Sequence, residues 1–319
     1  MEKLQKFSRR KFLEYLTKAT LGGSFLALIL KFKGDQLGFK KILKEYLQEI
    51  KQKSTESWDL KKENELKQIQ KLLANRDWIK VLENKFLMAS FYWSEGFWQK
   101  LEKDLRMNNS KKNVGNQNEP IIQKSFYWEI KKLLSPQIKN EFYKFLITYA
   151  SQKFSFEKTS SETKLSLPLK KFIIPEGKNH PDALDIFTDE GEPIFSITNG
   201  LVVLADKNWK ENDYFSSHSM LGGNAVIIFD PQGKRFFRYA HLDKVEVNVG
   251  QIVLAGEVIG TVGHTGINAQ KPGHGNHLHL EINKIVQDKN NNFKVISLKS
   301  EQIKKLINKI KISKNENSN

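Results

Sequence analysis

Cysteine is absent from this sequence of 319 residues. Its absence excludes disulfide bonds, zinc sites built on thiolates, a cysteine nucleophile and a lipid attached to an N-terminal cysteine. A nucleophilic serine motif and a phosphate-binding glycine loop are also missing. Any metal bound by this chain must therefore lie on histidine, aspartate or glutamate side chains.

Acidic residues are few relative to basic ones, with 36 Asp and Glu against 52 Lys and Arg, for a net charge of +16. The excess lies outside residues 170–290, where 12 basic residues face 15 acidic ones and leave +19 for the remainder. The basic remainder suits an anionic membrane or wall surface. We expect no nucleic-acid partner, because a solvated Lys-rich helix face explains the charge more simply.

Long apolar runs are scarce, and the first lies near the N-terminus. "SRRKFL" (residues 8–13) precedes the mostly apolar "ATLGGSFLALIL" (19–30), which is too short for an ordinary membrane span. This order is typical of an export signal and resembles the twin-arginine type. We expect an exported protein of the periplasm or cell envelope, anchored by this segment if it is not cleaved. The alternative is an amphipathic helix that opens a cytosolic protein.

The remaining sequence changes its pattern once. Up to about Phe154, apolar residues recur at spacings of three and four, which indicates helices at 58–73, 78–105, 120–134 and 136–154. "SFYW" occurs twice, at 90–93 and 125–128, and such aromatic stripes are usually core. The predicted organisation is a signal or anchor (1–34), a helical domain (35–154), a linker (155–168), a second domain (169–290) and a basic C-terminal helix and tail (291–319).

Short β-branched runs replace the helical pattern after Leu167. Examples are "GLVVLAD", "NAVIIFD", "FFRYAHL" and "EVIGTVG", separated by glycine and Asn or Asp turns. Strands of this length and spacing predict an all-β sandwich or barrel. The whole chain is therefore expected to be α+β, with an all-α region followed by an all-β domain.

Three histidines fall within "HGNHLH" of a chain that holds seven. In "HLHLE", strict alternation places His277, His279 and Glu281 on one face of a strand and the leucines on the other. Two residues along a strand span roughly 6.6 Å, a separation that suits one metal ligand with a neighbour beside it. One imidazole would hold a metal and the other would handle its water.

Two further stretches supply partners for these histidines. "NHPDALDIF" offers His180, Asp182 and Asp185 before a strand, and "RYAHLD" places His241 at the end of another. Catalytic zinc takes three protein ligands from such side chains and keeps a fourth position for water. The sequence therefore offers enough ligands for one zinc ion.

The order of these motifs, with "VGQIVLAGEVIGTVGHTG" between them, resembles the lysostaphin or LytM-type zinc metallopeptidases over about residues 180–282. These bacterial enzymes cut peptide bonds in peptidoglycan, and their all-β domain is a duplicated hybrid motif. The resemblance implies one Zn²⁺ per chain on His180, Asp185 and His279, with His241 and His277 as catalytic residues. We predict His277 as general base and His241 as a group that stabilises the oxyanion, and either histidine as the donor to the leaving amine. Peptidoglycan peptides would be the substrate.

The resemblance leaves choices open. His180 and Asp185 are one residue further apart than the family's pair, so Asp182 is a second choice for the carboxylate. The runner-up function is an inactive LytM-like module that binds the wall or activates another hydrolase, and a third is a structural metal site or none. The family's turn glycines correspond to positions where a positive φ is expected: Gly250, Gly256, Gly260, Gly263 and Gly266.

Overall fold

The structure is a computed structural model that describes residues 59–110, 121–157, 165–175 and 180–316, apart from Asn212, Tyr214 and Pro272. The chain divides into two compact units, residues 1–64 and 65–319. Of the first unit, only residues 59–64 are described, and they are helical. The predicted export signal or anchor lies outside the described residues. In the part of the chain that the structure describes, no helix has both the length and the apolar character of a membrane span.

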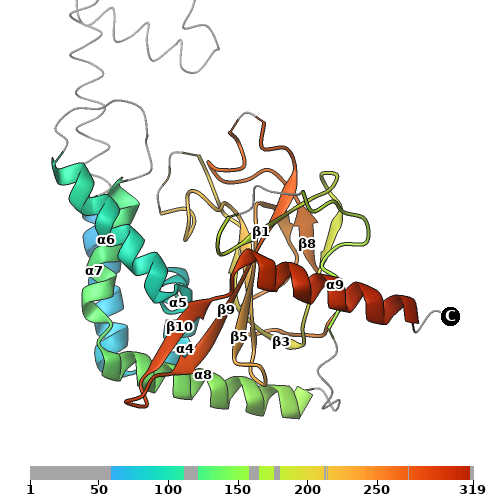
Figure 1. Cartoon of the computed structure of the whole chain (residues 1–319). Coiled ribbons are helices and arrows are strands. Elements are labelled where there is room, and N and C mark those ends of the chain that lie inside the picture. The colour runs from blue at the N-terminus through green and yellow to red at the C-terminus, as the bar shows by residue number, and fades with distance from the viewer. Residues whose placement is uncertain are drawn as a thin grey trace, which may run out of the picture. The chain divides into compact units, whose positions relative to one another are not determined.

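Helices make up the first part of the second unit (Figure 1). Residues 65–75 are helical. They are followed by α4 (Trp78–Glu83), α5 (Lys85–Tyr92), α6 (Glu95–Ser110), α7 (Ile121–Leu133) and α8 (Pro136–Glu157). Pro136 begins α8 at the position where proline costs no hydrogen bond, and the Ser135 hydroxyl accepts from the Ile138 amide at 3.2 Å.

The single helix predicted for residues 78–105 is wrong, because the chain breaks it twice. The Asn84 side chain accepts hydrogen bonds from the amides of Phe86 and Leu87, at 3.1 and 2.9 Å. Asn84 therefore caps α5 and ends α4 in an extended conformation. A second extended residue, Trp93, separates α5 from α6. Apolar periodicity continued across both breaks and concealed them.

Within the described residues, ten strands form two antiparallel sheets. The strands are β1 (Leu184–Phe187), β2 (Pro193–Phe195), β3 (Gly200–Asp206), β4 (Ala225–Asp230), β5 (Arg235–Ala240), β6 (Leu242–Val245), β7 (Ile252–Val253), β8 (Val258–Val262), β9 (His277–Gln287) and β10 (Phe293–Ser297). The larger sheet has the order β1-β9-β5-β4-β3-β7, with β10 also paired to β9, and the smaller has the order β2-β8-β6. Helices followed by an antiparallel-sheet domain confirm the predicted α+β class.

The two faces of the larger sheet have separate cores. Alternate residues such as Ile227, Phe229 and Phe236 pack with helices α4 to α8 in one core. Their neighbours in sequence, such as Ile228 and Phe237, pack in a second core with the smaller sheet and α9 (Ser300–Glu316). The helical region therefore covers the face of the sheet to which the odd-numbered residues of β9 belong.

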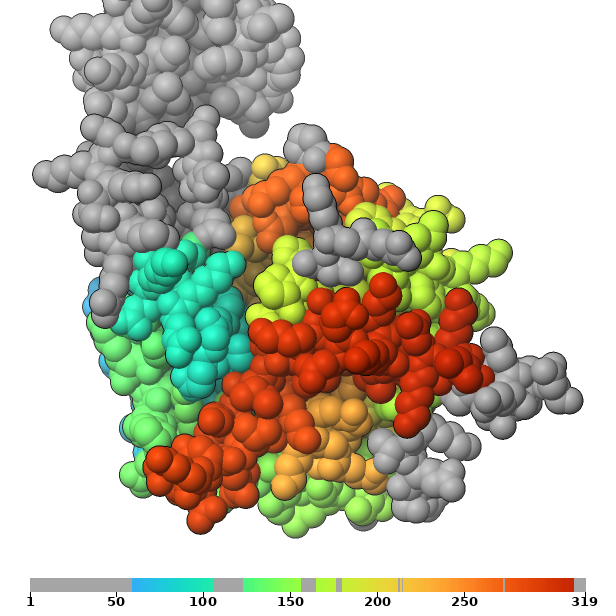
Figure 2. All heavy atoms as spheres, viewed as in Figure 1, coloured from blue at the N-terminus to red at the C-terminus, as the bar shows by residue number. Residues whose placement is uncertain are grey.

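The C-terminal helix α9 closes the second core and lies at the surface (Figure 2). It buries Ile303, Ile307 and Ile310, spaced as one helix face requires, and it contacts β1. At its start, the Ser300 amide donates to the Pro181 carbonyl at 3.0 Å. This bond fastens the loop that carries His180.

The glycines predicted to have a positive φ fall into two groups. Gly250, Gly256 and Gly266 have φ between 86 and 92°. Gly260 and Gly263 are not among the positive-φ residues, so the prediction is wrong for these two. A Cβ at either would come within 2.3 Å of the backbone of β6. They are glycines because two backbones approach closely there.

Candidate metal centre

The register of β1 against β9 places an aspartate beside a histidine. Asp185 is the direct cross-strand partner of His279, and Ala240 of β5 pairs with His279 on the other side. Side chains directly opposite on antiparallel strands share one face, with Cβ atoms about 5 Å apart. Leu278 and Leu280 are fully buried on the opposite face, as the alternation of "HLHLE" predicts.

His180, Asp185 and His279 lie together, although 99 positions of chain separate the first from the last. Each offers one ligand atom, and these atoms all lie within 4.8 Å of one another. His180 Nε2 is 3.6 Å from one Asp185 carboxylate oxygen, and His279 Nδ1 is 2.7 Å from the other. The His180 side chain is 52% exposed, whereas Asp185 and His279 are 12% and 13% exposed. The group is therefore open to solvent on the His180 side.

Asp182, the second choice for the carboxylate, points elsewhere. Its Oδ1 accepts a hydrogen bond from Lys299 Nζ at 2.6 Å, and about half of its side chain is exposed. It is not a member of the group formed by His180, Asp185 and His279. The geometry therefore favours Asp185 as the third ligand.

His241 and His277 lie beside this group, with ring centroids 4.9 Å apart. Each ring is held through Nδ1 by a backbone carbonyl, that of Thr265 at 2.8 Å and that of Gly275 at 3.1 Å. Because a carbonyl oxygen only accepts, Nδ1 carries the proton in both rings and Nε2 is the free nitrogen of the neutral form. His277 Nε2 is 3.9 Å from an Asp185 oxygen, so it faces the group.

The histidines of the site differ in their pKa and therefore in their protonation. Burial lowers the pKa of His277 and of His180, and it holds the pKa of His241 well below its usual value. Burial acts on His279 in the same direction, but hydrogen bonds to Asp185 and Glu281 raise its pKa to about 9. For Asp185, burial is outweighed by the hydrogen bond from His279, which lowers its pKa to about 2. His241 and His277 are therefore neutral near pH 7, and the free Nε2 of His277 is suited to accept a proton.

Residues 179–293, which hold all five of these side chains, match the family model described as Peptidase family M23. The chain carries a peptidase family M23 domain. The match confirms the resemblance to lysostaphin and LytM-type peptidases.

The named relatives match less than half of this chain. Glycyl-glycine endopeptidase ALE-1 of Staphylococcus capitis is 32% identical over 105 residues, which are 33% of this chain and 25% of that protein. Lysostaphin of Staphylococcus simulans is 32% identical over 98 residues, 31% of this chain and 17% of that protein. The NMR solution structure of lysostaphin matches at 25% identity and a TM-score of 0.30, over 41% of this chain and 51% of that one. The chain thus spans a quarter or less of the length of these curated relatives.

The alternation of "HLHLE" places Glu281 on the same face as His277 and His279, but no role is predicted for it from the sequence. Its Oε1 accepts from His279 Nε2 at 3.0 Å and from Arg238 Nη1 at 2.6 Å. Its Oε2 accepts from the Tyr92 hydroxyl at 2.6 Å. Alternation along β9 was the signal for Glu281, whereas no local pattern connects Tyr92 of α5 with a strand 189 residues away.

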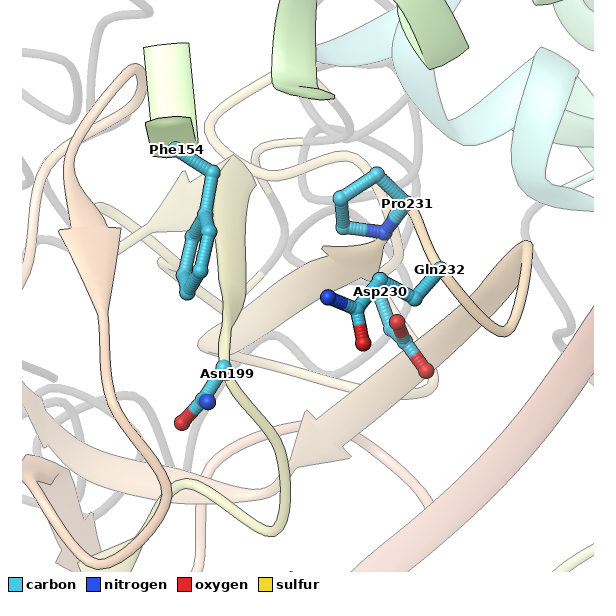
Figure 3. Close-up of a pocket in the computed structure, with 5 residues that line it drawn as sticks. All are labelled: Phe154, Asn199, Asp230, Pro231 and Gln232. Carbon is cyan, nitrogen blue, oxygen red and sulfur yellow. The ribbon is translucent and has the colours of Figure 1, made fainter. Parts of the chain in front are cut away.

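The other histidines have separate surroundings. His218 lies between β3 and β4, fully buried, and its Nδ1 is 2.7 Å from Asp206. His274 precedes β9, and its ring centroid is 6.2 Å from that of His277. A shallow pocket lined by Phe154, Asn199, Asp230, Pro231 and Gln232 (Figure 3) includes none of the predicted site residues. The pocket lies at the Asp230 end of β4. His241 lies near the other end of this strand, because it follows Ala240, the partner of Ala225.

Proposed function

We propose that the M23 domain is a zinc-dependent endopeptidase that hydrolyses peptide bonds of bacterial peptidoglycan. One observation carries the proposal, namely that His180, Asp185 and His279 converge beside His241 and His277. All five residues come from motifs that suggested this chemistry in the sequence. ALE-1 and lysostaphin, which are similar to this domain, support the same substrate class.

The residues present fit zinc. Two imidazoles and one carboxylate make the donor set that zinc uses in catalytic sites, which keep a further position for water. The exposed side of His180 leaves room for that position to face solvent. When bound, one Zn²⁺ would act as a Lewis acid that lowers the pKa of water and polarises a carbonyl. His180, Asp185 and His279 would hold it.

The protein's own part in the reaction is to move protons. His277 Nε2, kept free by the hydrogen bond of Nδ1 to Gly275, would accept a proton from the attacking water. The protonated ring could then donate that proton to the amine that leaves as the peptide bond breaks. The positive charge so formed on His277 is stabilised by Asp185, whose carboxylate lies 3.9 Å away.

The role predicted for His241, stabilising an oxyanion, depends on which ring nitrogen carries the proton. Stabilising an oxyanion requires a proton on Nε2, but the Thr265 carbonyl holds the proton of the neutral ring on Nδ1. Burial, the main cause of its low pKa, opposes a second proton. His241 would therefore stabilise an oxyanion only in a form that carries a proton on Nε2, reached when Nδ1 gives up its proton or when the ring is protonated at both nitrogens.

Digestion of purified peptidoglycan tests this function. Wild-type protein with zinc should release new amino termini, and mass analysis of the fragments would identify the bond. His279→Ala should lose both zinc and activity, whereas His277→Ala should keep zinc and lose activity. Peptidoglycan bound without cleavage by zinc-loaded wild type would favour the runner-up function, an inactive wall-binding module or activator of another hydrolase.

Other parts of the proposal concern the whole chain. We further propose that the β domain is a duplicated hybrid motif and that the protein has an N-terminal export signal or anchor. Its position would then be the periplasm or cell envelope, which agrees with a peptidoglycan substrate. The basic charge outside residues 170–290 would hold the protein against an anionic membrane or wall surface. Release from anionic vesicles by salt would test that contact.

A further inference from the structure

We propose that Tyr92, which lies outside the M23 domain, is a positioning residue for the metal ligand His279 and acts through Glu281. This assignment rests on the proposed zinc site and extends it into the helical region. Tyr92 is the last residue of α5, so a helix that precedes the M23 domain would help to define the metal centre.

A continuous line of hydrogen bonds joins the helix to the ligand. The Tyr92 hydroxyl donates to Glu281 Oε2 at 2.6 Å, and His279 Nε2 donates to Glu281 Oε1 at 3.0 Å. The other nitrogen of the same ring, Nδ1, faces Asp185 at 2.7 Å. A carboxylate on Nε2–H fixes the tautomer that leaves Nδ1 for a metal and also sets the plane of the ring.

Glu281 depends on its partners because its charged carboxylate is largely removed from solvent. Its side chain is 23% exposed, and Arg238, which is 7% exposed, supplies the compensating charge through Nη1 at 2.6 Å. Arg238 shares Oε1 with His279, so the Tyr92 hydroxyl is the donor that holds the second oxygen. Loss of that donor would free the carboxylate to rotate about the Cγ–Cδ bond of Glu281.

Tyr92 is itself held firmly. Its ring is fully buried and meets the Phe236 ring edge-on, with centroids 5.8 Å apart. Its backbone carbonyl accepts from Asn283 Nδ2 at 3.0 Å. Asn283 lies two residues beyond Glu281 on β9, so the same strand fixes both ends of Tyr92. The hydroxyl therefore meets Glu281 in one defined position.

Zinc affinity of the full-length protein provides the test. Tyr92→Phe keeps the buried ring and removes only the hydroxyl. Tyr143→Phe is the matched control, because that hydroxyl is also buried and donates at 2.6 Å, but to the Phe91 carbonyl. Competition with a chromophoric chelator would measure the Kd for zinc, and thermal unfolding in EDTA would measure stability without metal.

Replacing a direct partner of a metal-bound histidine weakens affinity about 10- to 100-fold, so we expect that for Glu281→Gln. Tyr92 acts one step further away, and we expect its Phe variant to weaken zinc binding about 3- to 10-fold relative to Tyr143→Phe. Both Phe variants should lose similar thermal stability in EDTA. In the Glu281→Gln background, the effect of Tyr92→Phe on zinc binding should disappear.

Three results would overturn the assignment. Equal zinc affinity in Tyr92→Phe and Tyr143→Phe would overturn it while leaving the proposed function intact. A full effect of Tyr92→Phe that persists in the Glu281→Gln background would show that the hydroxyl acts by another route. A wild-type protein that binds no zinc would instead overturn the proposed function, and this assignment with it.

Discussion

Zinc binding to the metal-free protein should release close to one proton per chain at pH 6.5. The proton comes from His279, whose pKa is raised to about 9 because its hydrogen bonds to Asp185 and Glu281 outweigh burial. Nδ1 of His279 must lose its proton before it can bind a metal. Asp185, with a pKa of about 2, is already ionised, and burial keeps His180 mostly neutral.

The size of the effect follows from that pKa. At pH 6.5 the ring of His279 lies two to three pH units below its pKa of about 9, so removing its proton costs about 3 kcal/mol of zinc affinity. The Kd for zinc should therefore fall about tenfold for each unit of rising pH and level off near pH 9. Zinc affinity rises with pH because the proton on His279 competes with the metal at every pH below the raised pKa of that ring.

Isothermal titration calorimetry in two buffers with different enthalpies of ionisation would count the proton. A pH of 6.5 is suitable because zinc-bound water, with a pKa of about 7, is then still mostly protonated. Glu281→Gln removes one of the two carboxylates that retain the proton, so its Kd should level off at a lower pH. Asp182→Asn is the control with no expected change, because that carboxylate pairs with Lys299. A binding enthalpy independent of the buffer would refute the assignment of His279 as a protonated ligand.

Two further substitutions separate metal binding from folding. Asp185→Asn should remove most zinc binding in equilibrium dialysis while Asp182→Asn retains it, and the reverse result would move the third ligand to Asp182. Asp206→Asn should lower the free energy of unfolding by about 2–4 kcal/mol in urea at pH 7, because Oδ2 of Asp206 accepts from the Ser217 hydroxyl and from two nitrogens of His218 in a buried site. Burial opposes the ionisation of Asp206, but the hydrogen bond from His218 outweighs it and lowers the pKa of Asp206 to about 2. In wild type, the stabilisation by this carboxylate should therefore be lost as the pH falls from about 4 to about 2. An Asp206→Asn protein as stable as wild type at pH 7 would contradict this account.

The strand with the histidines was predictable because its evidence is local. Alternation in "HLHLE" is a property of neighbouring residues, and the structure places Leu278 and Leu280 in the core as alternation requires. The helix breaks were harder to predict. Asn84 caps α5 inside a run whose apolar spacing continues, and a cap is recognised with certainty only from its hydrogen bonds.

The arrangement of the site depended on information that one sequence does not contain. Whether Asp182 or Asp185 faces His279 is decided by the register of β1 against β9, and a shift of one residue would turn Asp185 to the other face of the sheet. The contact of Tyr92 with Glu281 depends on how α5 packs across the sheet. An aromatic residue in "SFYW" looks like core whether or not its hydroxyl has a partner, and Tyr92 is both core and a hydrogen-bond donor.

The core that α4 to α8 share with the larger sheet limits how this protein can be cut for experiments. A chain shortened to begin at residue 165 would retain every side chain of the metal centre, yet it would expose Ile227, Phe229 and Phe236 to water. Such a fragment is expected to aggregate or to need solubilising substitutions on that surface. A shortened form of this protein for experiments should therefore keep the helices.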